Sequence, residues 1–370
     1  MKIDNILKHS HGSVLFSVLL TATSLLASCD VHQWPEPPHD PVTPDIPSIP
    51  EGEQKVTLAL NLHYNTGFSY SLHTYDSKTD VLSPSSANTP SGYDNLDNLT
   101  PGTNMKVTVK VHRNNGSRTL VASESFVTQH DNGFDTSVEL EVPSNNEYIV
   151  TVWSHILDNS GSAFYNDNDF NSIGLIEENF AGNTDLRDAF RGQLSLSVPE
   201  DGIVSGVVEM HRPLGKLEFI ATGVNDFVAH EQQGQPNSGR ATPAEEYTVV
   251  ISYPAYYPSS YTAIDDRLES SSTGFGYSSA ITLGEGSTDE MSLGFDYVML
   301  NNVSDASVQV KVSIFDRDGV SVASTSTLTV PMQRDIHTIV RSNFFDNNAS
   351  GNGGVGIDPD FDGDYNVPLP

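Results

Sequence analysis

Apolar and polar residues alternate with a period of two through most of the chain from residue 54 onward. In QKVTLALNLHY, residues 54–64, every second side chain from Val56 to Tyr64 is apolar, so these side chains share one face. Further segments of this kind lie at residues 105–112, 137–142, 192–198, 245–253, 307–315 and 326–330. Clusters of Gly, Asn, Asp and Pro separate them, which is typical of antiparallel sheets with one solvated face. The pattern predicts an all-β protein built as a sandwich, with only a short helical patch around residues 183–190.

A weak internal repeat indicates how many such domains to expect. Residues 106–116, KVTVKVHRNNG, resemble residues 308–319, VQVKVSIFDRDG, and a VAS triplet follows each copy. Residues 140–153, LEVPSNNEYIVTVW, likewise resemble residues 328–340, LTVPMQRDIHTIV. In both copies a strand ends at Val-Pro, where a proline without an N–H fits, and a return strand follows a polar turn. Two hairpin pairs of similar build predict two tandem β-domains with a boundary near residue 212.

Cys29 is the only cysteine of the chain and ends an apolar run. That run, Val14–Leu26, has only Ser and Thr as polar members and is too short to span a bilayer. With Lys2 and Lys8 before it, the run is typical of the hydrophobic region of a secretory signal peptide. Residues 26–29, LASC, resemble the lipobox of bacterial lipoproteins. This resemblance implies cleavage before Cys29, a diacylglycerol on its sulfur and an acyl chain on its new amine.

Lipidation of Cys29 would leave no thiol for a disulfide, a metal ion or a catalytic dyad. The alternative is a buried structural cysteine within a chance apolar segment. Residues 30–50 follow with seven prolines in 21 positions, which excludes a helix or an inner strand and favours extended polyproline II geometry. The segment is expected to be either a spacer that holds the folded part away from the lipid or a disordered tail without a length requirement.

These boundaries divide the sequence into five segments. They are a lipoprotein signal peptide at 1–28, the lipidated cysteine and Pro-rich tether at 29–53, an N-terminal β-sandwich at 54–212, a C-terminal β-sandwich at 213–345 and a Gly/Asp-rich tail at 346–370.

Charge and motifs exclude several classes of function. The chain carries 18 Lys and Arg against 48 Asp and Glu, a net charge of −30, so phosphate backbones would repel it and nucleic acid is not an expected partner. Its 12 histidines lack the HExxH spacing of a zinc site, and neither a nucleophile elbow nor a phosphate-binding loop occurs. Carboxylates are too numerous for any acid/base pair to stand out. We therefore expect no enzymatic activity and no cofactor apart from the covalent lipid.

The acidic tail offers a weak calcium motif in IDPDFDGDYN, residues 357–366. Its alternating aspartates are Asp358, Asp360, Asp362 and Asp364. With Gly363 at the sixth position, they match the start of a calcium loop, but Leu369 stands where that loop requires a bidentate Glu. A solvated acidic tail is the preferred interpretation, and a weak calcium or magnesium site is the alternative.

A tyrosine-rich segment lies at residues 253–266, YPAYYPSSYTAIDD. Its tyrosines are Tyr253, Tyr256, Tyr257 and Tyr261. Tyrosines in a loop can stack on sugar rings or anchor a protein interface. The other interpretation is a loop whose tyrosines cover the end of the sandwich.

Three segments carry a resemblance to a known family: HRPLGKLEFIATG at 211–223, VPMQRDIHTIVRSNFF at 330–345 and GVGIDPDFDGDYNVPLP at 354–370. They resemble the fimbrillin superfamily, and more narrowly the lipoprotein anchor and minor-subunit branch of type V pili from Bacteroides-type bacteria. The resemblance implies two tandem transthyretin-like, Greek-key β-sandwich domains and a lipid anchor in the outer membrane, on the cell surface. Fimbrial subunits or other surface proteins would be the partners.

Stalk subunits of that superfamily polymerise after an arginine-specific protease removes an N-terminal strand and opens a groove for a neighbour's strand. Here no arginine precedes Arg113, which lies inside a predicted hairpin. A cut that frees only a leading strand is therefore not available, which favours a retained anchor or assembly factor over a polymerising stalk. The alternative function is a surface lipoprotein that captures glycan through the tyrosine-rich loop.

Overall fold

The structure is a computed structural model that describes residues 53–86, 102–129, 135–233, 245–284 and 286–346. Two stacked sheets, here called sandwich 1, contain seven strands. The first sheet has the order β11 (Ile203–Met210), β1 (Lys55–Tyr64), β6 (Thr136–Pro143). The second has the order β10 (Ala189–Val198), β7 (Asn146–Ile156), β4 (Asn104–Arg113), β5 (Leu120–Gln129).

The apolar face that alternation predicts for β1 is the core face of sandwich 1. Leu58 and Leu60 are at most 1% exposed and belong to the same buried cluster as Val107 and Val109 of β4. Leu58 lies opposite Leu140 of β6, so the neighbouring strand presents its own apolar face to the same core. Full burial of each such side chain contributes about 1.5–3 kcal/mol.

Two further sheets form sandwich 2. One has the order β17 (Met291–Met299), β12 (Leu214–Ala221), β21 (Ile336–Ser342), β2 (Ser69–Asp76), β3 (Val81–Pro84). The other has the order β16 (Gly276–Leu283), β13 (Glu245–Ser252), β18 (Ser307–Phe315), β19 (Ser321–Ser324), and β20 (Leu328–Pro331) also pairs with β18. Their inner faces share one buried cluster that includes Phe219, Val249, Val310 and Val340. The expectation of an all-β sandwich protein is confirmed.

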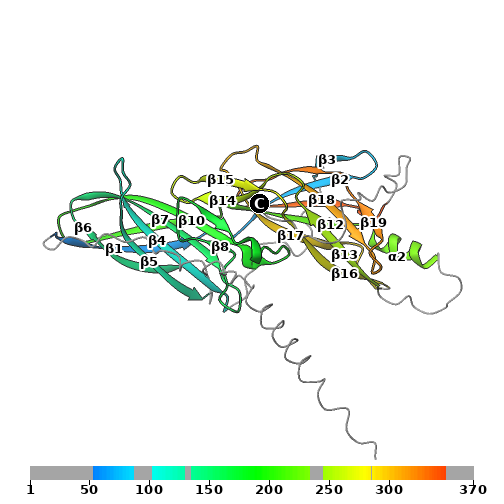
Figure 1. The fold of residues 1–370 in the computed structure, drawn as a ribbon, viewed down its shortest axis with the longest axis horizontal. Coiled ribbons are helices and arrows are strands. Elements are labelled where there is room, and N and C mark those ends of the chain that lie inside the picture. The colour runs from blue at the N-terminus through cyan, green and yellow to red at the C-terminus, as the bar shows by residue number, and fades with distance from the viewer. Residues whose placement is uncertain (1–52, 87–101, 130–134, 234–244, 285, 347–370) are drawn as a thin grey trace, which may run out of the picture. The chain divides into compact units, whose positions relative to one another are not determined.

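Strands β2 and β3 cross from one sandwich to the other. They follow β1 in the sequence, yet β2 pairs in parallel with β21, with Leu72 opposite Ile339. Figure 1 shows β2 and β3, in blue, beside the strands of sandwich 2. The expected division into 54–212 and 213–345 therefore does not match the sheets for residues 69–84. The reason is that β12 pairs with only one edge of β21. Strand β2 pairs with the other edge and so extends that sheet.

The repeat also has a different meaning from the expected pairs of hairpins. β4–β5 and β18–β19 are paired hairpins in both copies. After the Val-Pro ends, however, β6 and β7 lie in different sheets, and so do β20 and β21. The polar turn in each copy carries the chain between the two layers of a sandwich, so the repeat records a shared topology.

A third layer covers the outer face of β7. It is a small sheet with the order β15 (Arg267–Ser272), β14 (Tyr257–Thr262), β9 (Ile173–Leu175), β8 (Tyr165–Asn166). Trp153 of β7 is fully buried against it, with ring centroids 5.8 Å from Tyr165 and 5.9 Å from Tyr261. The contact between Trp153 and Tyr261 thus joins β7 of sandwich 1 to β14, which comes from the C-terminal half of the sequence.

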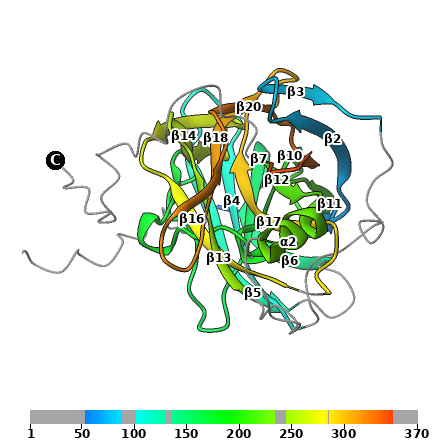
Figure 2. The same ribbon diagram turned by 90° about the vertical axis from the view of Figure 1, so that its right-hand side faces the viewer.

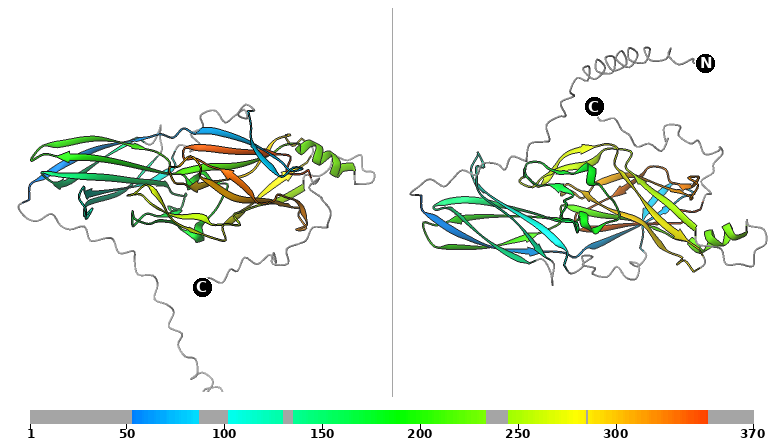
Figure 3. Two further views of the ribbon diagram at one scale, coloured as in Figure 1. Left: turned by 90° about the horizontal axis from the view of Figure 1, so that it is seen from above. Right: turned by 60° about the horizontal axis from the view of Figure 1, so that its bottom comes forward.

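The helices are short. Two 3₁₀ turns, η2 (Glu177–Asn179) and η3 (Asp185–Arg187), precede β10, and η3 falls within the patch expected at 183–190. The helix α2 (Val224–Gln233) was not expected, and Figure 3 shows it at one end of sandwich 2. Its Val224 belongs to the core, and Phe227 and Val228 pack against that core at helical spacing. Within the described ranges, no helix is long and apolar enough to cross a membrane.

Candidate functional site

Three of the four tyrosines of the predicted ligand-binding loop lie in the core. Tyr253, Tyr257 and Tyr261 are at most 3% exposed, and only Tyr256 is exposed, at 76%. Tyr253 directly follows β13, and Tyr257 and Tyr261 belong to β14 of the third layer, with the ring of Tyr257 stacked on that of Phe275. Buried in this way, these three residues cannot contact a glycan or a partner, which was one of the two interpretations of the segment. Cys29 and the tail aspartates lie outside the described residues.

The buried tyrosines surround an ion pair that the sequence analysis missed. Arg187 of η3 pairs with Asp296 of β17, and both side chains are 1% exposed. Tyr253 and Tyr257 each donate a hydroxyl hydrogen bond to Asp296 Oδ2, at 2.6 and 3.0 Å. Burial raises the pKa of Asp296 and of both tyrosines. Because this network is closed to solvent, its role is structural.

A second buried pair stands at the junction of the two sandwiches. Arg212, between β11 and β12, donates from Nε to both carboxylate oxygens of Asp188 at 2.9 Å. Its guanidinium lies 3.9 Å from the ring centroid of Phe68 and 4.7 Å from that of Phe190. Burial is the main influence on both groups and raises the pKa of Asp188, while the arginine opposes it. The geometry fixes Arg212 as part of a rigid wall.

Beside Arg212 a polar pocket of about 410 Å³ opens to solvent. It collects residues from five separate parts of the chain. They are Arg191 to Gln193 of β10, Glu209 and His211 to Pro213 around the end of β11, Asp266 in one turn, Asn302 in another, and Arg334 and Asp335 before β21. An added Cβ at Gly192 would meet Met210 Sδ and Val208 Cγ1 at 2.6 Å, so a glycine allows β10 and β11 to approach here.

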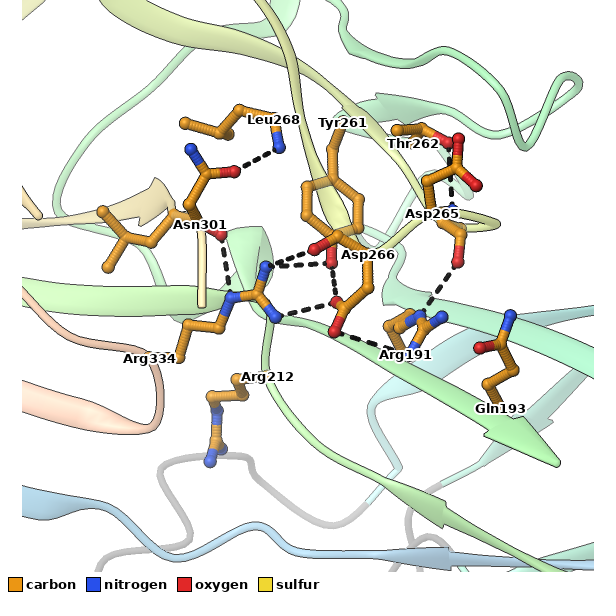
Figure 4. Close-up of polar contacts among 12 residues, drawn as sticks. Arg191, Gln193, Arg212, Tyr261, Thr262, Asp265, Asp266, Leu268, Asn301 and Arg334 are labelled. Carbon is orange, nitrogen blue, oxygen red and sulfur yellow. Dashed lines mark hydrogen bonds and ion pairs between the residues drawn. The ribbon is translucent and has the colours of Figure 1, made fainter. Parts of the chain in front are cut away.

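Arg334 and Asp266 form one wall of the pocket. Figure 4 shows the Arg334 guanidinium directed at Asp266 and Tyr261. Its Nη1 donates to Asp266 Oδ1 at 2.7 Å, and its Nη2 donates to Tyr261 Oη at 3.1 Å. Burial alone would raise the pKa of Asp266, but the Tyr261 hydroxyl, Arg191 and Arg334 hold it below its usual value. Asp266 is therefore a carboxylate at neutral pH.

Arg191 is less fully bonded than the other two arginines of the pocket. Its Nε donates to Ala263 O at 2.9 Å, while its Nη1 lies 3.8 Å from Asp266 Oδ2, beyond hydrogen-bond distance. Its Nη2 is buried and has no acceptor among the described residues. Next to it, Gln193 donates from Nε2 to Ile264 O at 3.0 Å. Of these groups, Nη1 is the donor of Arg191 that a ligand could use.

Only indirect features of the sequence point to this pocket. Its residues extend from Arg191 to Arg334, so no local spacing connects them. His211, Arg212 and Pro213 do lie in the HRPLG segment, and Arg334 and Asp335 in the MQRD segment, both of which carry the family resemblance. Over the described ranges, no cluster of His, Cys, Asp and Glu could hold a metal ion.

Comparison with solved structures finds distant relatives. A proposed adhesin from Bacteroides thetaiotaomicron VPI-5482 is 12% identical to this chain. The match covers 79% of this chain and 93% of that chain, with a TM-score of 0.38. A fimbrial assembly protein from Parabacteroides distasonis ATCC 8503 is 13% identical, with coverage of 78% and 90% and a TM-score of 0.36. The fimbrial anchor protein Mfa2 from Porphyromonas gingivalis is 9% identical, with coverage of 73% and 82% and a TM-score of 0.36.

Identities and TM-scores this low leave the function to be argued from the chain's own residues. No curated protein matches the sequence. One family model does match, over residues 51–370, and its description is a family of unknown function, DUF6562. Since that match covers nearly the whole chain, the protein belongs to the DUF6562 family.

Proposed function

We propose that the protein is a lipid-anchored cell-surface protein that acts through protein–protein contacts, as a fimbrial anchor, a minor pilus subunit or an adhesion factor. The sequence resemblance to fimbrillins and the lipobox support the surface location. The observation that carries the contact mechanism is the edge strand β16. An edge strand presents a row of backbone N–H and C=O groups to which a strand of another chain can add.

Strand β16 differs from the other sheet edges in lacking the usual protection. Among the described strands it pairs with β13 alone, over eight residues, and Figure 2 shows it beside β13 at the margin of the sheet. Its sequence GYSSAITL contains neither a charge nor a proline, and Ser278, Ala280 and Thr282 are exposed. By contrast, β5, β6 and β15 each carry glutamate. Strands β3 and β19 have only four residues each, and β3 also ends in proline. Charge, proline and short length are the devices that block strand addition.

A charge introduced on β16 should abolish the contact. Ala280→Lys is expected to remove crosslinks between the protein and its surface partner in the bacterium that encodes it, because lysine on an edge blocks strand pairing. Asn61→Lys is the matched control, since Asn61 is exposed on the central strand β1. The measurement is crosslinking of intact cells followed by mass spectrometry. Unchanged crosslinks in Ala280→Lys would remove β16 as the docking edge.

The lipid anchor is tested at Cys29. In cells fed an alkyne analogue of palmitate, the wild-type protein is expected to take up the label and Cys29→Ala to take up none. The chain has a single cysteine, so no other thiol can accept the lipid. Loss of the protein from the outer-membrane fraction should accompany loss of the label, because several acyl chains anchor far more firmly than one. Labelling of Cys29→Ala at the wild-type level would refute the anchor.

A further inference from the structure

We propose that the polar pocket around Arg191 binds a neutral saccharide unit. This site differs from the β16 edge and does not depend on the fimbrial role. The volume of about 410 Å³ lies in the range of small-ligand sites. Such sites are mostly apolar with a few polar groups, whereas this lining is almost entirely polar, which favours a ligand rich in hydroxyl groups. The chemistry of its walls selects the ligand.

The walls of the pocket that contain Arg212 and Arg334 are preorganised. Arg212 is held by Asp188, and its backbone N–H donates to Asp335 Oδ1 at 3.0 Å. Arg334 is held by four hydrogen bonds: two to Asp266 and one each to Leu300 O and Tyr261 Oη. Ordering these long side chains therefore costs nothing further when a ligand enters, which favours affinity.

The rim of the pocket mixes donors and acceptors. Gln193, Glu209, His211 and Asn302 are all exposed and line the opening. An amide and an imidazole can both donate and accept, and a carboxylate accepts. A sugar hydroxyl also donates and accepts at once, so a ring with several hydroxyls can satisfy such a rim from several sides.

The gap between Arg191 and Asp266 has the spacing for a bridging hydroxyl. Nη1 of Arg191 and Oδ2 of Asp266 are 3.8 Å apart and form no direct hydrogen bond. One oxygen between them could accept from the guanidinium and donate to the carboxylate, and it would serve the least bonded donor of the site. The charged oxygens of an anionic ligand are acceptors only, so one of them placed in this gap could not donate to Asp266 and would be repelled by its carboxylate.

Charge and polarity disfavour other ligands. The arginines Arg191, Arg212 and Arg334 face the carboxylates of Glu209, Asp266 and Asp335, so the lining offers no excess of positive charge for a phosphate or an acidic sugar. Among the described residues, Pro213 is the only apolar side chain of the lining, so the pocket offers an apolar peptide side chain little surface to bury against.

Binding is tested by ligand-observed NMR on the full chain, purified in a detergent without sugar groups. The probes are D-glucose, D-galactose, D-mannose, N-acetyl-D-glucosamine, L-rhamnose, D-glucuronate and inorganic phosphate. At least one neutral sugar should bind saturably with a Kd of about 1 mM, the strength expected of a few solvent-exposed hydrogen bonds without an aromatic platform. Glucuronate and phosphate should bind more weakly than that sugar.

Rim variants locate the site. Asn302→Ala and His211→Ala should each weaken the binding about three- to tenfold, the value of one lost hydrogen bond. Tyr256→Ala should leave it unchanged, because Tyr256 is exposed outside the pocket. Ala280→Lys should also leave it unchanged, so that failure of the docking edge and failure of the pocket are separate results. Absence of saturable binding by every neutral sugar, stronger binding of phosphate or glucuronate, or full binding by both rim variants would overturn the proposal.

Discussion

Replacing Arg187 by alanine is expected to lower the free energy of unfolding by about 3–5 kcal/mol, the loss typical when one partner of a buried ion pair is removed. The guanidinium is fully buried, and beyond Asp296 it donates to Tyr257 Oη at 3.1 Å and to Tyr297 O at 3.0 Å. It also lies 4.3 Å from the ring centroid of Phe180. Alanine removes all of these contacts and leaves the Asp296 carboxylate buried without its cation. Urea unfolding followed by circular dichroism measures the loss.

Two comparisons make that result specific. Arg317→Ala removes an arginine whose side chain is 72% exposed, and it should change stability by less than about 0.5 kcal/mol. The double variant Arg187→Met with Asp296→Leu should be more stable than Arg187→Ala, because no buried charge then lacks a partner.

The stability difference between Arg187→Ala and the wild type should also depend on pH. Burial already raises the pKa of Asp296, and the loss of Arg187 would raise it further above the unfolded-state value. The penalty should therefore be largest above that folded-state pKa and shrink as the pH falls and Asp296 becomes neutral. Equal stability of Arg187→Ala and wild type at neutral pH would contradict a stabilising role for the pair.

Trp153→Ala is expected to cost about 3–5 kcal/mol, the usual range for a buried tryptophan. Trp153 is fully buried against the third layer, and its ring packs edge-on to Tyr165 and at a tilt to Tyr261. The cavity would open between β7 of sandwich 1 and the sheet that covers it. Denaturant midpoints from circular dichroism provide the measurement, since the substitution also removes a fluorophore.

Trp153→Phe is the matched control. Its ring keeps most of the packing, and it removes an indole N–H that is buried without an acceptor among the described residues. Deleting such an unsatisfied donor offsets part of the packing loss, so Trp153→Phe should be clearly more stable than Trp153→Ala. Equal losses in the two variants would contradict a stabilising role for the packing of this ring against Tyr165 and Tyr261.

Much of the fold follows from local pattern. The alternating segments at 105–112 and 307–315 fall within β4 and β18, because one buried face repeats every second residue in any half-buried strand. The parallel pairing of β2 with β21 has no such local trace, since register between strands so far apart in sequence depends on which edges the rest of the fold leaves open. The strand β3 pairs locally with β2, but its four residues are too few to show an alternating pattern.

The functional residues were harder to predict than the fold. Nothing in the sequence distinguishes Tyr257 and Tyr261 from Tyr256. Only the packing of β14, a strand of the third layer, against the rest of the protein makes the first two core residues. The polar pocket is built from residues between 191 and 335 that meet only in three dimensions. Its arginines gave no pattern, because each belongs to a different strand or turn.

The crossing of β2 into sandwich 2 has a consequence for the order in which the chain can become folded. Strand β21 lies between β12 and β2, so the sheet cannot close until residues 336–342 have joined residues 69–76. Bringing together segments so far apart along a chain is slow, because the entropy of closing the loop must be lost before any contact is gained. For the surface location proposed above, a chain exported N-terminus first would thus remain without its second sandwich until nearly all of it has crossed the inner membrane, and an unfolded chain is the form that can pass through a narrow channel.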